Sequence, residues 1–182
     1  MKHKTLYKFL RTGLKSDNGE NRDWKIGEWR KEESIEICFT GFHASQNPAH
    51  ALSYVQGEII ALVEVKGKSV SGKDKECWSE MSIKKAWHWK KEDSIAFAIF
   101  AAEQVICIYE KQYPNDDRPR KAIEAAKKYL KNPTEENKDA AADAAYAAAY
   151  AARAAGAADA ALWEKLGEWM EKRIKKLEPY NE

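Results

Sequence analysis

The sequence predicts an α+β protein, with a small N-terminal mixed sheet and a short helix followed by an alanine-rich helical hairpin or bundle. Up to about residue 92, apolar and polar residues tend to alternate, which is the period of a β-strand. Beyond Asp93 the apolar residues recur every three or four positions, as on a helix face. Sixteen of the 22 residues from Ala140 to Ala161 are alanine, the best helix former. We therefore expect an α+β domain over residues 1–92 and a helical domain over residues 93–182.

Four segments with alternating or β-branched residues predict the strands of the sheet: 5–11, 34–39, 58–66 and 81–86. The polar stretch over residues 12–29 contains three glycines, so we expect a loop there. Gly67 and Gly72 predict a turn after the third strand.

Capping residues predict the helices. Asn47 and Pro48 indicate the start of a short helix, because asparagine is a favoured N-cap and proline is favoured at the first helical position. In the C-terminal half, proline and capping residues gather only near 113–117 and 132–134, which predicts two breaks. The helices expected there are 93–110, capped by Asp93 or Ser94, 119–130, and an alanine-rich helix over 134–176 with weak points at Gly156 or Gly167.

The composition is that of a soluble globular protein, with 33% charged and 44% hydrophobic residues in a chain of 182. No apolar run is long enough to span a bilayer, and the start of the chain does not resemble a signal peptide, so we expect a cytoplasmic protein of a bacterial host cell. The three cysteines form no C-x-x-C pair, so neither a zinc site nor a disulfide framework is expected. We expect no metal and no cofactor.

The string from Thr40 to Pro48 places a glycine, His43 and Ser45 between a strand and a helix N-terminus. One interpretation is a shallow anion or nucleotide site, with a glutamate from elsewhere as acid or base. The other is that Ser45 makes a turn hydrogen bond and His43 packs on an aromatic ring. We favour the second, because no other histidine or carboxylate lies at the spacing that catalysis requires.

Trp87 and Trp89 lie among lysines that include Lys90. Such a cluster can stack nucleic-acid bases and hold phosphates. We favour a strand or turn that packs one tryptophan on the core and leaves the lysines in water. Both rings share one face of an extended chain, so an anchor for a protein partner is a further alternative. The same alternatives apply to Trp24, Trp29 and Arg30.

Tyr146 and Tyr150 lie one turn apart on the alanine-rich helix. They are equally consistent with core packing on a neighbouring helix and with an interface. A helix with so many alanines is stabilised only where another helix approaches it closely, so we also expect a homodimer.

The residues Gly41-Phe42-His43-Ala44-Ser45 and Asn47-Pro48 resemble a domain of unknown function found in phage and mobile-element proteins, over about residues 5–106. The segment 113–126 and the alanine-rich helix resemble modules described as immunity proteins. The combination resembles the type II-A anti-CRISPR proteins of gut bacteria, which inhibit an RNA-guided DNA nuclease. Neither module implies a catalytic residue.

This resemblance implies a non-enzymatic protein that binds a bacterial CRISPR effector nuclease, or another defence protein, and blocks DNA binding or cleavage. Nucleic-acid contact is expected to be weak or indirect, and the net charge of +2 argues against plain mimicry of DNA. The alternatives are a nucleotide-binding enzyme resembling ADP-ribosyltransferases and a nucleic-acid-binding protein that uses the Trp/Lys cluster. The expected partner-binding residues are Trp24, Trp29, Arg30, His43, Ser45, Trp87, Trp89, Lys90, Tyr146 and Tyr150.

Overall fold

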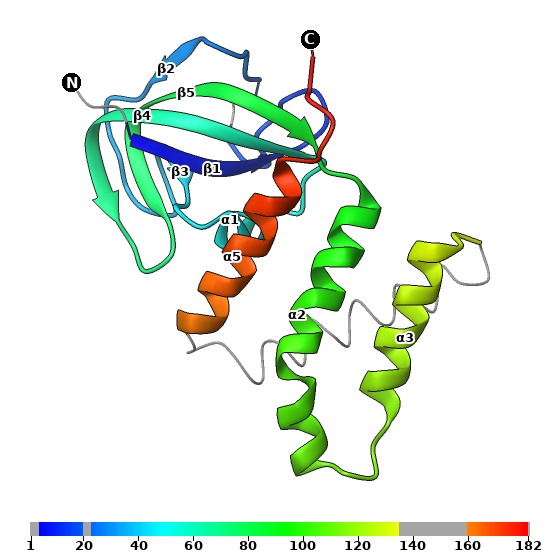
Figure 1. Ribbon diagram of the computed structural model, residues 1–182. Helices are drawn as coiled ribbons and strands as arrows, with labels where there is room; N and C mark the ends of the chain where they lie inside the picture. The colour runs from blue at the N-terminus through cyan, green and yellow to red at the C-terminus, as the bar shows by residue number, and fades with distance from the viewer. Residues whose placement is uncertain (1–3, 20–22, 135–159, 182) are drawn as a thin grey trace. The chain divides into compact units, whose positions relative to one another are not determined.

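The computed structural model describes residues 4–19, 23–134 and 160–181 (Figure 1). The chain forms two compact units, one of residues 1–89 together with 167–182 and the other of residues 90–166. The first unit therefore contains the C-terminal residues that the expected division at residue 92 assigns to the helical domain.

A five-stranded sheet forms the first unit (Figure 1). Its strands are β1 (Lys4–Leu10), β2 (Trp29–Lys31), β3 (Phe42–Ala44), β4 (Ile59–Ser71) and β5 (Glu76–His88). The order is β1-β4-β5-β2, and β3 also pairs with β5. Every pairing between these strands is antiparallel, so the expectation of a mixed sheet is wrong. For the longest pairing, β4 with β5, the physical reason is the short connection between them, which permits a hairpin but is too short for a parallel crossover.

The sheet closes back on its first strand. Tyr7 in β1 pairs with Ser45, directly after β3, through two backbone hydrogen bonds of 2.8 and 2.9 Å. Because β3 pairs with β5 and β5 with β4, the strands β1, β4, β5 and β3 form a closed circuit. The enclosed core consists of Leu6, Leu10, Leu14, Trp24, Phe42, Ala44, Ile59, Ala61, Val63, Val65, Met81, Ile83 and Ala86.

Three of the expected strand segments differ in the structure. The fourth segment, 81–86, extends over 76–88 as β5. Residues 34–39 form no strand, because a turn with Cys38 at φ 72° joins Glu36 to Thr40 by a single bridge. The third segment is longer than expected, since β4 runs through Gly67 to Ser71. Gly67, at φ +85°, lies at an irregularity in the β4–β5 register rather than in the hairpin turn.

The short helix α1 (Pro48–Tyr54) begins where the sequence predicts. The side chain of Asn47 accepts a hydrogen bond of 2.8 Å from the backbone N–H of Ala49, which is the expected N-cap. Gly167 lies against this cap, because a Cβ atom on Gly167 would come within 2.7 Å of the Asn47 amide oxygen.

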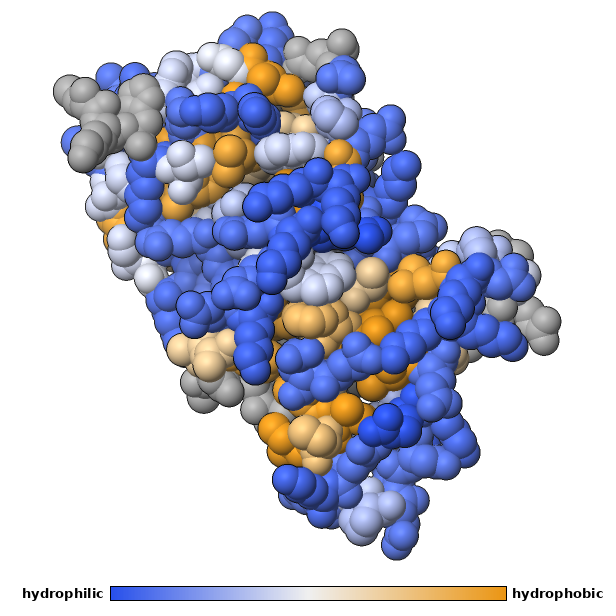
Figure 2. Space-filling view, in the orientation of Figure 1, coloured by the Kyte–Doolittle hydropathy of each residue, from blue (hydrophilic) through white to orange (hydrophobic). Residues whose placement is uncertain are grey.

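In the second unit, α2 (Lys91–Gln112) and α3 (Arg118–Lys131) form a hairpin separated by the expected break near 113–117. The cap of α2 is Lys90 rather than Asp93 or Ser94. Asp93 instead accepts a hydrogen bond from the Lys90 backbone N–H, as in a capping box. Hydrophobic residues gather along α2 and its seam with α3 (Figure 2).

The last helix, α5 (Ala160–Ile174), passes from one unit to the other at Gly167. Most of the alanine-rich segment, residues 135–159, lies outside the described residues, and so does the weak point expected at Gly156. The tail after α5 returns to the sheet of the first unit, where the backbone N–H of Tyr180 donates to the Ala86 carbonyl at 2.9 Å. None of the helices within the described ranges has the length and apolar character needed to cross a membrane.

Gly41 provides a test of this packing. It has φ +95°, and a Cβ atom there would lie 2.6 Å from the Cys77 sulfur and 2.9 Å from Ile35. Gly27 has a similar φ of +83° with nothing within 4 Å. Both Gly→Ala changes strain the backbone by roughly 1–2 kcal/mol, but only Gly41→Ala also overpacks its surroundings. Denaturant unfolding should show Gly41→Ala to be the less stable variant by about 1–3 kcal/mol. Equal stability of the two variants would contradict the close packing around Gly41.

Candidate functional site

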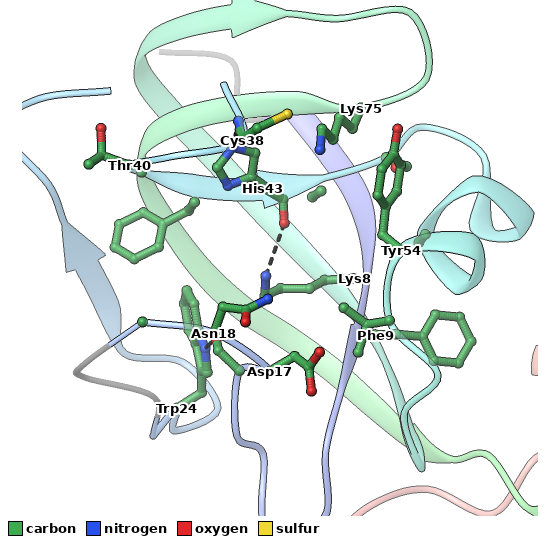
Figure 3. Close-up of a pocket in the computed structure, with 18 of the residues that line it drawn as sticks. Lys8, Phe9, Asp17, Asn18, Trp24, Cys38, Thr40, His43, Tyr54 and Lys75 are labelled. Carbon is green, nitrogen blue, oxygen red and sulfur yellow. Dashed lines mark hydrogen bonds between the residues drawn. The ribbon is translucent and has the colours of Figure 1, made fainter. Parts of the chain in front are cut away.

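A pocket of about 520 Å³ lies in the first unit (Figure 3). Its walls come from β1, the loop before β2, the turn that leads into β3, the end of α1 and the residue before β5. The volume is in the range of small-molecule sites. Aromatic rings and cationic side chains contribute much of its lining, which includes Lys8, Trp24, Arg30, His43, Tyr54 and Lys75.

Lys8 extends from β1 into the pocket, where its ammonium donates a hydrogen bond of 3.1 Å to the backbone carbonyl of His43 (Figure 3). Among the residues that the structure describes, no carboxylate forms an ion pair with this lysine. Burial lowers the pKa of Lys8 to about 8, and the nearby charge of Arg30 acts in the same direction. The ring centre of Trp24 lies 5.9 Å from this ammonium. The pocket therefore contains an ammonium that faces an aromatic ring and is paired with no carboxylate of the described residues.

Arg30 and Trp24 form a second wall. The Arg30 guanidinium lies 4.4 Å from the centre of the Trp24 ring and 5.3 Å from that of Phe42. The Trp24 indole N–H donates to the Ser16 hydroxyl at 2.7 Å, which fixes the orientation of the ring. Burial lowers the pKa of Arg30, although the guanidinium remains charged.

On another wall, the ammonium of Lys75 lies 4.1 Å from the centre of the Tyr54 ring (Figure 3). The Tyr54 hydroxyl donates to the carboxylate of Asp74. Burial and this hydrogen bond raise the pKa of Tyr54 to about 12, so its phenol is protonated at neutral pH. Tyr54 is 46% exposed, which leaves part of its ring accessible at the pocket.

The ring of His43 is held by the backbone on both sides. Its Nε2 atom accepts a hydrogen bond of 2.9 Å from the Cys38 N–H, and a second bond joins the ring to the backbone of Gly41. Burial and the charges of Lys8 and Lys75 lower the pKa of His43. The imidazole is thus neutral at pH 7 and positions the turn instead of serving as a free base. Ser45 is buried and pairs with Tyr7 through its backbone.

Two carboxylates also line the pocket, those of Asp17 and Glu32. Asp17 forms an ion pair of 2.7 Å with Arg11, which neutralises much of its charge. The three cations, Lys8, Arg30 and Lys75, therefore outnumber the carboxylates, and the pocket favours an anion.

Four of the other candidates, Trp29, Trp87, Trp89 and Lys90, do not line the pocket. Trp29 is 37% exposed, with the Lys66 ammonium 4.1 Å from the centre of its ring. Trp89 is 2% exposed and packs edge-on against Phe9, so it belongs to the core, and Trp87 is half-buried. Lys90 caps α2. Tyr146 and Tyr150 lie outside the described residues. The structure therefore brings together Trp24, Arg30 and His43, with Ser45 beside them.

Lys8, Tyr54 and Lys75 are absent from the sequence-based candidates. For Lys8 a signal exists, because the period of two along β1 places it on the same face as Leu6 and Leu10, both fully buried. A lysine on the buried face of a strand is an indication of a functional site. Tyr54 and Lys75 carry no such signal, because only the fold brings them together.

Comparison with known proteins gives two family matches. A domain of unknown function (DUF7666) matches residues 4–94, and a family of unknown function (DUF6931) matches residues 74–179. No curated protein and no solved structure matches the chain. Within the described ranges there is no cluster of three or more histidine, cysteine or acidic side chains arranged to hold a metal ion.

The environment of Lys8 predicts a specific pH dependence of stability. Its pKa is lowered from 10.5 to about 8 on folding, so between these values the unfolded chain binds more protons than the folded one. The free energy of unfolding of the wild type should therefore rise, relative to Lys8→Met, by up to about 3 kcal/mol as the pH increases through that window. Urea unfolding of the wild type and of Lys8→Met at matched pH values measures this difference in the free energy of unfolding. Parallel pH profiles would contradict the burial of an uncompensated ammonium.

Proposed function

The chain belongs to the two families of unknown function whose models it matches, DUF7666 and DUF6931, and we propose that its pocket binds a small planar organic anion of the nucleotide class. The single observation that supports this most strongly is the excess of cationic side chains inside a pocket that also presents aromatic rings. A planar ring and an anionic group match these two features.

The cations are arranged to receive an anion. Arg30 presents a planar guanidinium, which suits the bidentate binding of phosphate or carboxylate. Lys75 and Lys8 add positive charge from other walls. A hydrogen bond between charged groups contributes about 1.5–3 kcal/mol, and more where water is excluded.

The aromatic residues suit the planar part of such a ligand. Tyr54 and Phe39 line the pocket and are 46% and 78% exposed, so their rings are accessible to stack on a base. Trp24, in contrast, is buried under Arg30 and serves to hold the guanidinium in place. Because His43 is held by hydrogen bonds, the proposal is binding and does not include group transfer by an acid–base pair.

Calorimetric titration with ADP tests the proposal, with adenosine as the uncharged control. We expect saturable binding of ADP and binding of adenosine at least 10-fold weaker. Arg30→Met and Lys75→Met each remove one positive charge while keeping an apolar side chain of similar length. Each should weaken ADP binding by roughly 10- to 100-fold.

Lys85→Met is the matched control, because Lys85 is exposed on β5 and does not line the pocket. This variant should bind ADP as the wild type does. Equal affinities for ADP and adenosine, or an equal loss in Lys85→Met, would refute an anion site in the pocket. Thermal unfolding of each variant identifies any loss of binding that results from misfolding.

The resemblance to anti-CRISPR proteins supports a second proposal: that the chain binds a bacterial RNA-guided DNA nuclease, or another defence protein, inside the host cell and blocks it, as a homodimer. The exposed rings of Trp29 and Phe39 are suitable anchors for such a partner.

Pull-down of the purified nuclease on the immobilised chain tests this second proposal. The expected result is retention of the nuclease by the wild type and weaker retention by Trp29→Ala, which removes a half-exposed ring outside the pocket. Failure to retain the nuclease, with and without guide RNA, would exclude direct inhibition and leave the ligand-binding proposal unaffected.

A further inference from the structure

We propose that Lys8 is a nucleophile that forms an imine with an aldehyde or ketone group of an anionic ligand in the pocket. Only the anionic character of that ligand rests on the proposed function. The nucleophilic role follows from how the fold places this one amine.

The position of Lys8 satisfies the geometric requirement. The amine lies inside the pocket, where a small molecule can reach it, and its hydrogen bond is to a backbone carbonyl at 3.1 Å (Figure 3). A carbonyl oxygen accepts a hydrogen bond from a neutral amine as well as from an ammonium, whereas a carboxylate partner would hold the ammonium form.

Other lysines of the sheet are engaged as cations. Lys4, Lys66 and Lys84 form ion pairs with Glu76, Glu80 and Glu64, at 2.5, 3.4 and 2.5 Å. Lys75 lies 4.1 Å from the centre of the Tyr54 ring, where a cation is attracted to the aromatic face, whereas Lys8 lies farther from the Trp24 ring, at 5.9 Å. Lys8 combines a position in the pocket with the lack of a carboxylate partner among the described residues.

The groups that face Lys8 favour its neutral form. Burial, followed by the charge of Arg30, lowers the pKa of Lys8 to about 8, while the thiol of Cys77 acts in the opposite direction. The neighbouring His43 is itself kept neutral by burial. About a tenth of the amine is therefore unprotonated at pH 7, far more than for a lysine with the ordinary pKa of 10.5, as in enzymes whose nucleophilic lysines lie beside another cation.

The reaction balances without an added oxidant or reductant. The lone pair on the neutral Nζ atom attacks the carbonyl carbon, and the C=O electron pair moves to oxygen. The oxygen gains a proton through solvent, and the nitrogen loses one, which gives a carbinolamine. The nitrogen lone pair then expels the hydroxyl group, which gains a proton and leaves as one water molecule. Loss of the remaining N–H proton to solvent leaves the C=N bond of the imine.

Pyridoxal 5′-phosphate is a suitable probe, because it combines a planar ring, a phosphate and an aldehyde. The full-length protein is incubated with one equivalent at neutral pH, reduced with borohydride and mapped by peptide mass spectrometry. We expect the reduced adduct predominantly on Lys8, with Lys85 as an exposed internal reference. Pyridoxine 5′-phosphate, which lacks the aldehyde, should protect Lys8 from labelling.

Lys8→Arg keeps the positive charge and removes the nucleophile. This variant should still bind pyridoxine 5′-phosphate and should lose the adduct, while Lys85→Met should be labelled like the wild type.

Equal labelling of Lys8 and exposed lysines in the wild type would overturn the inference. If pyridoxine 5′-phosphate binds but Lys8 is not labelled, only the imine proposal fails. If pyridoxine 5′-phosphate does not bind but pyridoxal, which lacks the phosphate, labels Lys8, the proposed anion site is wrong and the nucleophilic role of Lys8 is supported.

Discussion

The pairing of Tyr7 with Ser45 is the constraint on which the pocket depends. These two backbone hydrogen bonds join β1 to the end of β3 and close the sheet into a circuit. They also bring Lys8, the next residue along β1, to the carbonyl of His43. The pocket is thus a consequence of sheet closure, since its walls come from segments far apart in the sequence. Hydrogen bonds from Cys38 and to Gly41 then hold His43 in this arrangement.

Electrostatics distinguishes this pocket from ordinary packing. Partial burial of an ammonium without a carboxylate partner costs stability, because the lost hydration is only partly replaced. The second cation beside Lys8, Arg30, increases that cost. Three other lysines of the sheet, Lys4, Lys66 and Lys84, form ion pairs with glutamates, whereas the pocket lysine Lys8 has no carboxylate partner among the described residues. Strongly perturbed ionisable groups cluster at functional sites, and this is the reason for proposing a binding site here.

Capping preferences and hydrophobic periodicity predict several elements of the fold correctly. The Asn47 cap, β1 and the break between α2 and α3 follow from capping chemistry and periodicity. The same rules give a wrong prediction for residues 34–39. Ile35 and Ile37 alternate with polar residues as in a strand, but they lie in and beside a turn and pack against Gly41 and Gly72. The pocket itself was only partly predictable. The sequence marks Trp24, Arg30 and His43 as candidate site residues, but their proximity to Lys8 and Lys75 depends on long-range strand pairing that no local pattern encodes.

A crystal structure of the chain with ADP would test the central claim most directly. The account predicts a phosphate within hydrogen-bonding distance of Arg30, Lys75 or Lys8 and the adenine ring against Tyr54 or Phe39, with the Tyr7–Ser45 pairing intact. Crystals grown at saturating ADP that show this pocket without ligand, or ADP bound only at another surface, would contradict it.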